Sequence, residues 1–289
     1  MPNSPFLYAY LTTMVAAFGA CVGSFLNVCI YRIPLQISVV TPRSRCPHCE
    51  NPIAWYDNIP ILSWLALRAR CRRCGGTISP RYILVEALVA ALFLLVWFKY
   101  RPAGGPCILA VAPVADLRLV PIYWLAICGL VLATFVDLEH LIIPDRVSLG
   151  GIVAGLLLSL WAPSLHGSIT RFDALGKAAI GAAVGGGVLW LVALLGRLIF
   201  RKDAMGFGDV KLMGAIGAFM GWKAVFFTLI LSSFFGSLVG GALVLAGRKE
   251  MQGRIPYGPF IALAALLWLF WGPLLWNGYI RLLTGSTPG

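Results

Sequence analysis

Long apolar stretches separated by short polar segments run through most of this 289-residue chain. A membrane-spanning helix needs about 20 mostly apolar residues. Seven stretches come close to that length or exceed it, and we expect a span in each: 6–31, 82–98, 119–136, 147–165, 178–196, 224–247 and 258–280. The shorter apolar stretch 210–221 is expected to cross as a short helix, which makes eight crossings. Segment 102–115 contains three prolines and is expected to be a loop or a re-entrant piece.

The composition supports an all-α polytopic membrane protein. Apolar residues make up 60% of the chain and charged residues only 12%, whereas a soluble domain carries about 25% charged residues. Much of the exterior must therefore face the lipid bilayer. The formal net charge is +12, but the basic residues lie between apolar blocks and are not interleaved with aromatic residues. Contact with anionic lipid headgroups is the simpler explanation, and we expect no nucleic-acid partner.

The distribution of basic residues predicts the orientation. With the N-terminus outside and eight crossings, 16 of the 23 lysines and arginines fall on the inside, in 32–81, 138–146, 197–211 and 248–257. This bias agrees with the positive-inside rule. The first charged residue is Arg32. Because no basic region precedes 6–31, we expect a retained helix there rather than a secretory signal.

Glycine pairs spaced by four residues indicate close helix packing. They are Gly181/Gly185, Gly217/Gly221 and Gly236/Gly240. Small residues at this spacing let two helix backbones approach each other in lipid.

One polar insert, 33–80, separates the first two spans and contains four cysteines in two CxxC pairs: Cys46, Cys49, Cys71 and Cys74. Four thiolates from two such turns form a closed, structural zinc site. An insert of this size usually needs such a staple. The alternative is two disulfides, which rarely persist in the cytosol where the orientation places the insert.

Two aspartates lie at the predicted cytoplasmic border of the membrane. Asp137 ends one apolar span, and Asp209 follows Gly206 and Gly208 in a Gly-x-Gly-Asp sequence. Two carboxyl groups held close together share a proton, so one can activate a water while the other protonates a carbonyl oxygen. Glycines beside the second acid would let an extended substrate backbone approach. Each aspartate taken alone also has a plainer interpretation. Asp137 would then be a residue at the membrane interface, and Asp209 would be a helix N-cap.

Three other polar residues have plainer interpretations. Asp145 follows Ile-Pro and precedes an apolar stretch, so we expect it to cap a helix. Glu86 lies one turn inside the second span, where we expect a structural pair with Arg81. Lys211 is expected to contact substrate or lipid phosphate.

These motifs resemble the type IV prepilin leader peptidases, bifunctional peptidase/N-methyltransferases of the Gly-x-Gly-Asp aspartyl protease type. The likeness runs from Gly23-Ser-Phe-Leu-Asn-Val to Tyr257-Gly-Pro. It includes Cys46-Pro-His-Cys, Asp57-Asn-Ile-Pro-Ile-Leu-Ser-Trp64, Ser79-Pro-Arg-Tyr-Ile-Leu-Val-Glu86 and Gly-Phe-Gly-Asp-Val-Lys.

The resemblance implies a multi-pass protein of the bacterial inner membrane that cleaves prepilins and pseudopilins at the cytoplasmic face, after the glycine that ends a basic leader. It implies Asp137 and Asp209 as the catalytic pair, and Cys46, Cys49, Cys71 and Cys74 as metal ligands. It also implies methylation of the new N-terminus by S-adenosylmethionine. We expect a first helix in 1–32, a zinc insert with the methyltransferase-associated region in 33–80, and the peptidase bundle in 81–289.

Two positions depart from the family pattern. Position 57 is Asp where the family often has Glu, and Ala69 stands where the family commonly has Gly. Ala69 precedes the second cysteine pair, so a peptidase-only relative is one alternative. A proton-coupled transporter is another, and it is disfavoured because transporter sites lie near the midplane of the bilayer rather than at one border.

Overall fold

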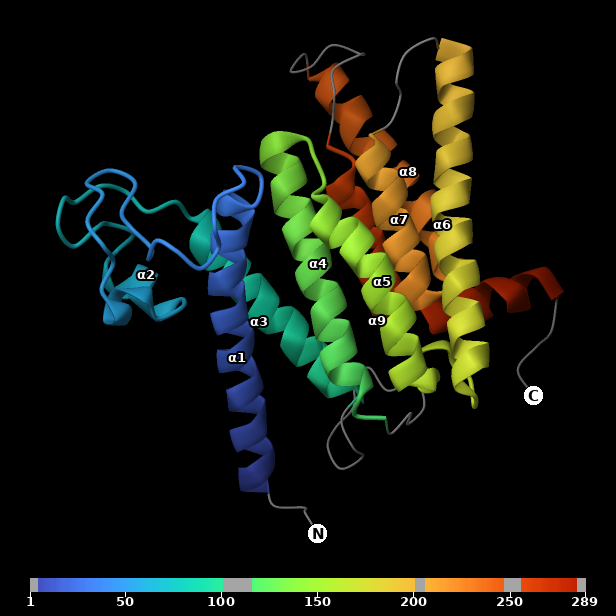
Figure 1. Ribbon diagram of the computed structural model, residues 1–289, viewed down its shortest axis with the longest axis horizontal. Coiled ribbons are helices and arrows are strands. Elements are labelled where there is room, and N and C mark those ends of the chain that lie inside the picture. Colours follow the sequence, from blue (N-terminus) through green and yellow to red (C-terminus); the bar gives the residue numbers. More distant parts are fainter. Residues whose placement is uncertain (1–4, 101–115, 201–205, 247–255, 285–289) are drawn as a thin grey trace.

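The computed structural model of the protein describes residues 5–100, 116–200, 206–246 and 256–284. Within these ranges the regular structure is helical, apart from two isolated β-bridges in the insert (Figure 1). The α-helices are α1 (Pro5–Arg32), α2 (Leu62–Ala66), α3 (Arg81–Tyr100), α4 (Leu119–His140), α5 (Asp145–Trp161), α6 (Arg171–Phe200), α7 (Phe207–Met220), α8 (Trp222–Leu245) and α9 (Gly258–Thr284). Two 3₁₀ helices are η1 (Trp55–Asn58) and η2 (Pro163–His166). The predicted loop or re-entrant piece at 102–115 lies outside the described residues.

The prediction of an all-α membrane protein is confirmed, and every predicted span lies largely within a helix. Six of the described helices are long and apolar enough to cross a membrane: α1, α3, α4, α6, α8 and α9. Helix α5 has 17 residues and α7 has 14, so eight crossings are not confirmed. Most of α7 is buried against its neighbours, which explains why its sequence is apolar although the helix is short.

Both short helices run between the same two ends of the bundle as the long ones (Figure 1). At one end, Arg81 at the start of α3 pairs with Glu139 in the last turn of α4. At the same end, Lys211 in the first turns of α7 pairs with Asp145 at the start of α5, at 2.7 Å. The starts of α3, α5 and α7 and the end of α4 therefore gather at one end, which we call the insert end because residues 33–80 lie there.

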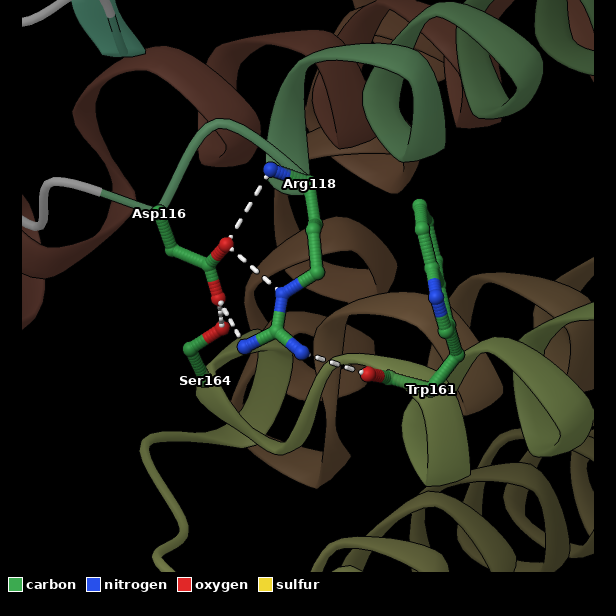
Figure 2. A network of polar contacts seen from close by, with 4 residues as sticks. All are labelled: Asp116, Arg118, Trp161 and Ser164. Carbon is green, nitrogen blue, oxygen red and sulfur yellow. Dashed lines mark hydrogen bonds and ion pairs between the residues drawn. The ribbon is translucent and has the colours of Figure 1, made fainter.

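The opposite end is tied by a polar network around Asp116 (Figure 2). Arg118 donates to both carboxylate oxygens of Asp116, each at 2.9 Å, and to the carbonyl of Trp161 at 2.9 Å. The Ser164 hydroxyl also donates to Asp116. The hydrogen bonds from Arg118 lower the pKa of Asp116 to about 2, so the carboxylate stays ionised and links the start of α4 to the end of α5 at any physiological pH.

Glycines allow two helix pairs to approach closely. Gly181 of α6 faces Gly217 of α7, and a side chain on either would collide with the backbone of the other. This confirms the role predicted for Gly181, Gly185 and Gly217. Gly221 instead forms the turn between α7 and α8, with φ +80°, and an added Cβ there would come no closer than 3.7 Å to a neighbour. The sequence analysis missed Gly19 and Gly23 of α1, where an added Cβ would lie 2.8 Å and 2.7 Å from Cα atoms of α3. Close backbone contact therefore joins α1 to α3 as well.

Candidate active site and metal centre

Asp137 lies in the last turn of α4 at the insert end, and only 5% of the residue is exposed. Its Oδ2 accepts a hydrogen bond of 2.8 Å from the backbone N–H of Gly258, the first residue of α9. A Cβ at position 258 would lie 2.8 Å from the same oxygen. The glycine therefore lets the start of α9 approach the carboxyl group closely enough for its N–H to donate.

Asp209 lies in the first turn of α7 and is also buried, with 8% of the residue exposed. Helix α7 begins after Gly206, which occupies the N-cap position. Asp209 is therefore the third helical residue rather than the cap, and the capping interpretation of this aspartate is wrong. A carboxyl group in the first turn still faces the positive end of the helix dipole.

The two aspartates come from different helices, α4 and α7, and both lie at the insert end. Their carboxyl groups lie close enough to interact electrostatically. Ile143, in the link from α4 to α5, packs against Gly208, where an added Cβ would lie 3.0 Å from the Ile143 Cβ. Gly208 thus makes room for this link and not, as we expected, for a substrate backbone. Gly206 is the glycine that lies beside the Asp209 carboxyl group. A Cβ added at Gly206 would lie 3.3 Å from Asp209 Oδ2.

Three other predictions about polar residues are wrong. Glu86 does not pair with Arg81, because its Oε2 accepts a 2.7 Å hydrogen bond from the backbone N–H of Ile61 and Arg81 pairs with Glu139. Asp145 is the first residue of α5 and Pro144 is the N-cap. Lys211, expected on substrate or lipid phosphate, donates instead to Asp145.

The four cysteines of the insert converge on one point. Their sulfur atoms all lie within 4.8 Å of one another, and the Cys46 and Cys74 sulfurs are 3.8 Å apart. A tetrahedral zinc ion with Zn–S distances of about 2.3 Å places its ligands about 3.8 Å apart. All the cysteines of the described residues are free thiols. The donor set and its spacing therefore fit a closed tetrahedral zinc site.

The two cysteine pairs have the same backbone conformation. Cys46 N donates to Asn51 O and Glu50 N to Cys46 O, while Cys71 N donates to Gly76 O and Gly75 N to Cys71 O. This is a structural repeat that the sequence analysis did not detect. Backbone N–H groups of Cys74 and Arg73 donate to the Cys71 sulfur and lower its pKa to about 6. The backbone at Cys71 thus favours the thiolate that a metal needs, whereas burial and the neighbouring cysteines raise the pKa of Cys74 to about 11.

Two cavities border the start of α5, and neither Asp137 nor Asp209 is among the residues that line them. One has a volume of about 320 Å³, lies between α4, α5 and α7, and is lined almost entirely by apolar side chains and glycines. The other, of about 920 Å³, opens at the insert end between residues 33–39 and 142–146. Arg146 lines both cavities.

Comparison with known proteins gives the family. The model of the Bacterial Peptidase A24 N-terminal domain matches residues 17–100, and that of the Type IV leader peptidase family matches residues 124–241. A prepilin leader peptidase/N-methyltransferase of Aeromonas hydrophila is 36% identical over 96% of this chain and 95% of its own length. The chain belongs to the type IV leader peptidase family. This confirms the resemblance drawn from the sequence motifs.

Other relatives of this leader peptidase family member carry the same name. A prepilin leader peptidase/N-methyltransferase of Myxococcus xanthus is 41% identical over 83% of this chain and 66% of its own length. One of Pseudomonas putida is 33% identical over 95% of this chain and 96% of its own length. Comparison with solved structures found no match.

Gly258, whose N–H donates to Asp137, was not predicted as a site residue of this leader peptidase family member. Gly258 was noted only as part of Tyr257-Gly-Pro, and nothing in that tripeptide identifies the carboxyl group to which its N–H donates. Tyr257 beside it bonds the Ser232 hydroxyl of α8 at 2.7 Å, which anchors the start of α9 to α8. The available signal was a glycine directly before an apolar span. Such a glycine suggests that the start of this helix approaches another element closely, but it does not indicate which residue of that element.

Proposed function

We propose that this protein removes the basic leader from type IV prepilins and pseudopilins and then methylates the new N-terminus. The observation that carries the peptidase activity is the position of two buried carboxyl groups, Asp137 and Asp209, at the same end of an apolar helical bundle, where they interact electrostatically. The methyltransferase activity rests on the names of the relatives. The six apolar helices and the family place the protein in the inner membrane as a multi-pass protein.

Asp137 and Asp209 are proposed to act as a pair on one water molecule. Two neighbouring carboxyl groups in a poorly solvated site hold one proton between them. The ionised member accepts a proton from water, whose oxygen attacks the scissile carbonyl carbon, and the protonated member donates to the carbonyl oxygen. The carboxyl group that took the water proton then passes it to the scissile nitrogen, the C–N bond breaks, and the leader and the new amino terminus are released. The Gly258 N–H holds Asp137 in a fixed orientation for this work.

The two cavities suit the two parts of such a substrate. The leader, which is polar and basic, would lie in the open cavity between residues 33–39 and 142–146. The apolar residues that follow the scissile bond would enter the apolar cavity between α4, α5 and α7. We place the insert end, and with it the cleavage site, on the cytoplasmic side, because most lysines and arginines flank the helices there.

We propose zinc as a structural ion held by Cys46, Cys49, Cys71 and Cys74, where four thiolates leave no coordination position for substrate. S-adenosylmethionine is the proposed methyl donor, and we assign no residue to its binding. No β-strand occurs in the described ranges, so these residues offer no strand–loop–helix site of the dinucleotide-binding type. The proposed division is a first helix in 1–32, the zinc insert with the methyltransferase-associated region in 33–80, and the peptidase bundle in 81–289.

The decisive experiment replaces each aspartate by its amide. Purified Asp137→Asn and Asp209→Asn proteins are incubated with a prepilin peptide and labelled S-adenosylmethionine, and the products are weighed by mass spectrometry. Each variant is expected to lose cleavage almost completely, because an amide neither accepts nor donates the shared proton. The control is Asp173→Asn, an exposed member of an i,i+4 pair with Lys177 in α6, which should cleave normally. More than a few per cent of the wild-type rate in either variant would exclude that residue from the pair.

The same experiment separates the alternatives. Cleavage without incorporation of the label would identify a peptidase-only relative. A folded wild-type protein that cleaves no prepilin would return the proton-coupled transporter to consideration.

A further inference from the structure

The insert carries a solvent-facing apolar surface close to the membrane-embedded part of the molecule. We call it the insert surface and define it by five exposed side chains in η1, α2 and the turn between them: Trp55, Tyr56, Ile59, Leu62 and Leu65. Trp55 is 81% exposed, Leu62 64% and Leu65 55%. Five large exposed apolar side chains within residues 55–65 are typical of a surface that contacts another apolar phase.

The position of α2 along the bundle indicates that the apolar phase in contact with the insert surface is the lipid bilayer. The N–H of Ile61, directly before α2, donates at 2.7 Å to Glu86, which lies in the second turn of the membrane-spanning α3. At the same level α1 touches α3, because a Cβ at Gly23 would lie 2.7 Å from the Glu86 Cα. In Figure 1, α2 lies at the height of the upper turns of α1 rather than above that helix. The insert surface therefore lies at the depth where these two helices enter the bilayer.

The residues that follow α2 supply the matching charge. Arg68 and Arg70 are exposed, as are Arg43, Arg45 and Arg73. Guanidinium groups bind phosphate through paired hydrogen bonds, and basic residues beside a span favour anionic lipid. Tryptophan and tyrosine are enriched in the headgroup region. Apolar anchors with arginines beside them thus suit one partner, an anionic lipid surface.

We propose that the insert surface lies in the headgroup region of the bilayer, with Arg68 and Arg70 on the phosphates of anionic lipids. This contact would hold the zinc insert at a fixed height beside the insert end of the bundle, with Glu86 as its second attachment. It does not depend on which reactions the protein catalyses.

The test measures whether lipid or water contacts Trp55. The full-length protein and its Trp55→Phe variant are placed in phosphatidylcholine nanodiscs, with and without phosphatidylglycerol, and with lipids brominated near the headgroup. The difference between the two emission spectra isolates Trp55. We expect lipid bromine to remove most of this difference signal and aqueous acrylamide to remove little. Trp190→Phe is the matched control, because Trp190 is half exposed on the middle of α6 and should be quenched by bromine placed deeper in the acyl chains.

The Trp55→Phe variant should keep the native fold, because the exposed Trp55 side chain makes few packing contacts. A zinc content equal to that of the wild type would show that the insert of the variant is folded. Quenching by acrylamide alone would overturn the proposal. Shielding from both quenchers would mean that a second copy of the chain covers the surface, and would overturn it too. An Arg68→Gln/Arg70→Gln protein should lose the extra quenching that phosphatidylglycerol brings, whereas Arg171→Gln at the opposite end of the bundle should keep it. Equal quenching of the wild type with and without phosphatidylglycerol would overturn the role of the arginines.

Discussion

The ammonium group of Lys99, in the last turn of α3, donates a hydrogen bond to the backbone carbonyl of Leu269 in α9. Leu269 lies four residues before Pro273, the proline inside α9. Proline has no N–H, so in a regular helix the carbonyl four residues earlier has no intrahelical donor. Lys99, which also donates to Phe270 O at 2.9 Å, thus supplies from another helix the bond that Pro273 removes.

This relationship predicts that Lys99 and Pro273 are energetically coupled. Lys99→Met should lower stability by about 1–3 kcal/mol, the cost of leaving a buried carbonyl unpaired. In a Pro273→Ala background the helix provides its own N–H, so the same substitution should cost less. Thermal unfolding of the four proteins in one detergent measures the coupling. An equal cost in both backgrounds would mean that Lys99 does not compensate for the proline.

Gly258→Ala should disable the peptidase without unfolding the protein. The new methyl group would lie 2.8 Å from Asp137 Oδ2 and 3.2 Å from Cγ, so α9 or the carboxyl group must move. Displacement of a catalytic group by about 1 Å costs about 10²-fold in rate. Cleavage of a prepilin peptide measures the effect. Gly278→Ala, where an added Cβ meets nothing within 4 Å, is the control in the same helix and should cleave at the wild-type rate.

The purified protein should contain about one zinc ion per chain, and a Cys46→Ser/Cys49→Ser protein should contain none. Because metal binding supplies much of the folding free energy of a small domain, the insert should unfold while the apolar bundle survives. If methyl transfer depends on the insert, methylation should fall further than cleavage. Elemental analysis measures the zinc content. Parallel assays of leader loss and N-methylation on one substrate compare the two activities. Equal loss of both activities would mean that the insert supports the whole active site.

Ala69→Gly should strengthen the insert. Ala69 has φ +58° and follows Arg68 at φ +51°, in a region that costs a residue with a side chain about 1 kcal/mol or more and costs glycine little. The substitution should slow the loss of zinc to a chelator and leave cleavage unchanged. Methylation should stay equal or rise. Faster zinc loss in the glycine variant would show that the alanine methyl group makes contacts worth more than the relief of strain.

The sequence by itself determined the parts of this protein that depend on local pattern. The length of each apolar stretch predicted the helices, because a span must satisfy its own backbone hydrogen bonds in lipid. Cysteines separated by two intervening residues predicted a metal site, because such a turn brings both sulfurs to one face. Asp137 and Asp209 were predicted as the catalytic pair for a similar reason, since an acid at the border of an apolar span is costly, and this pair remains a prediction.

Only the tertiary structure decided which groups contact one another. Asp137 and Gly258 are 121 residues apart in the chain, and Lys99 and Leu269 are 170 apart. The period of a helix predicts which of its faces is apolar, but not which neighbour covers that face or how the helix ends meet. The errors at Glu86, Asp145 and Lys211 have this origin. Glu86 was assigned a partner in its own helix, Asp145 a capping role and Lys211 a contact with substrate or lipid phosphate, and each has its partner on a different element. Hydrogen-bond partners at helix ends follow from the packing of the whole bundle, which no local spacing encodes.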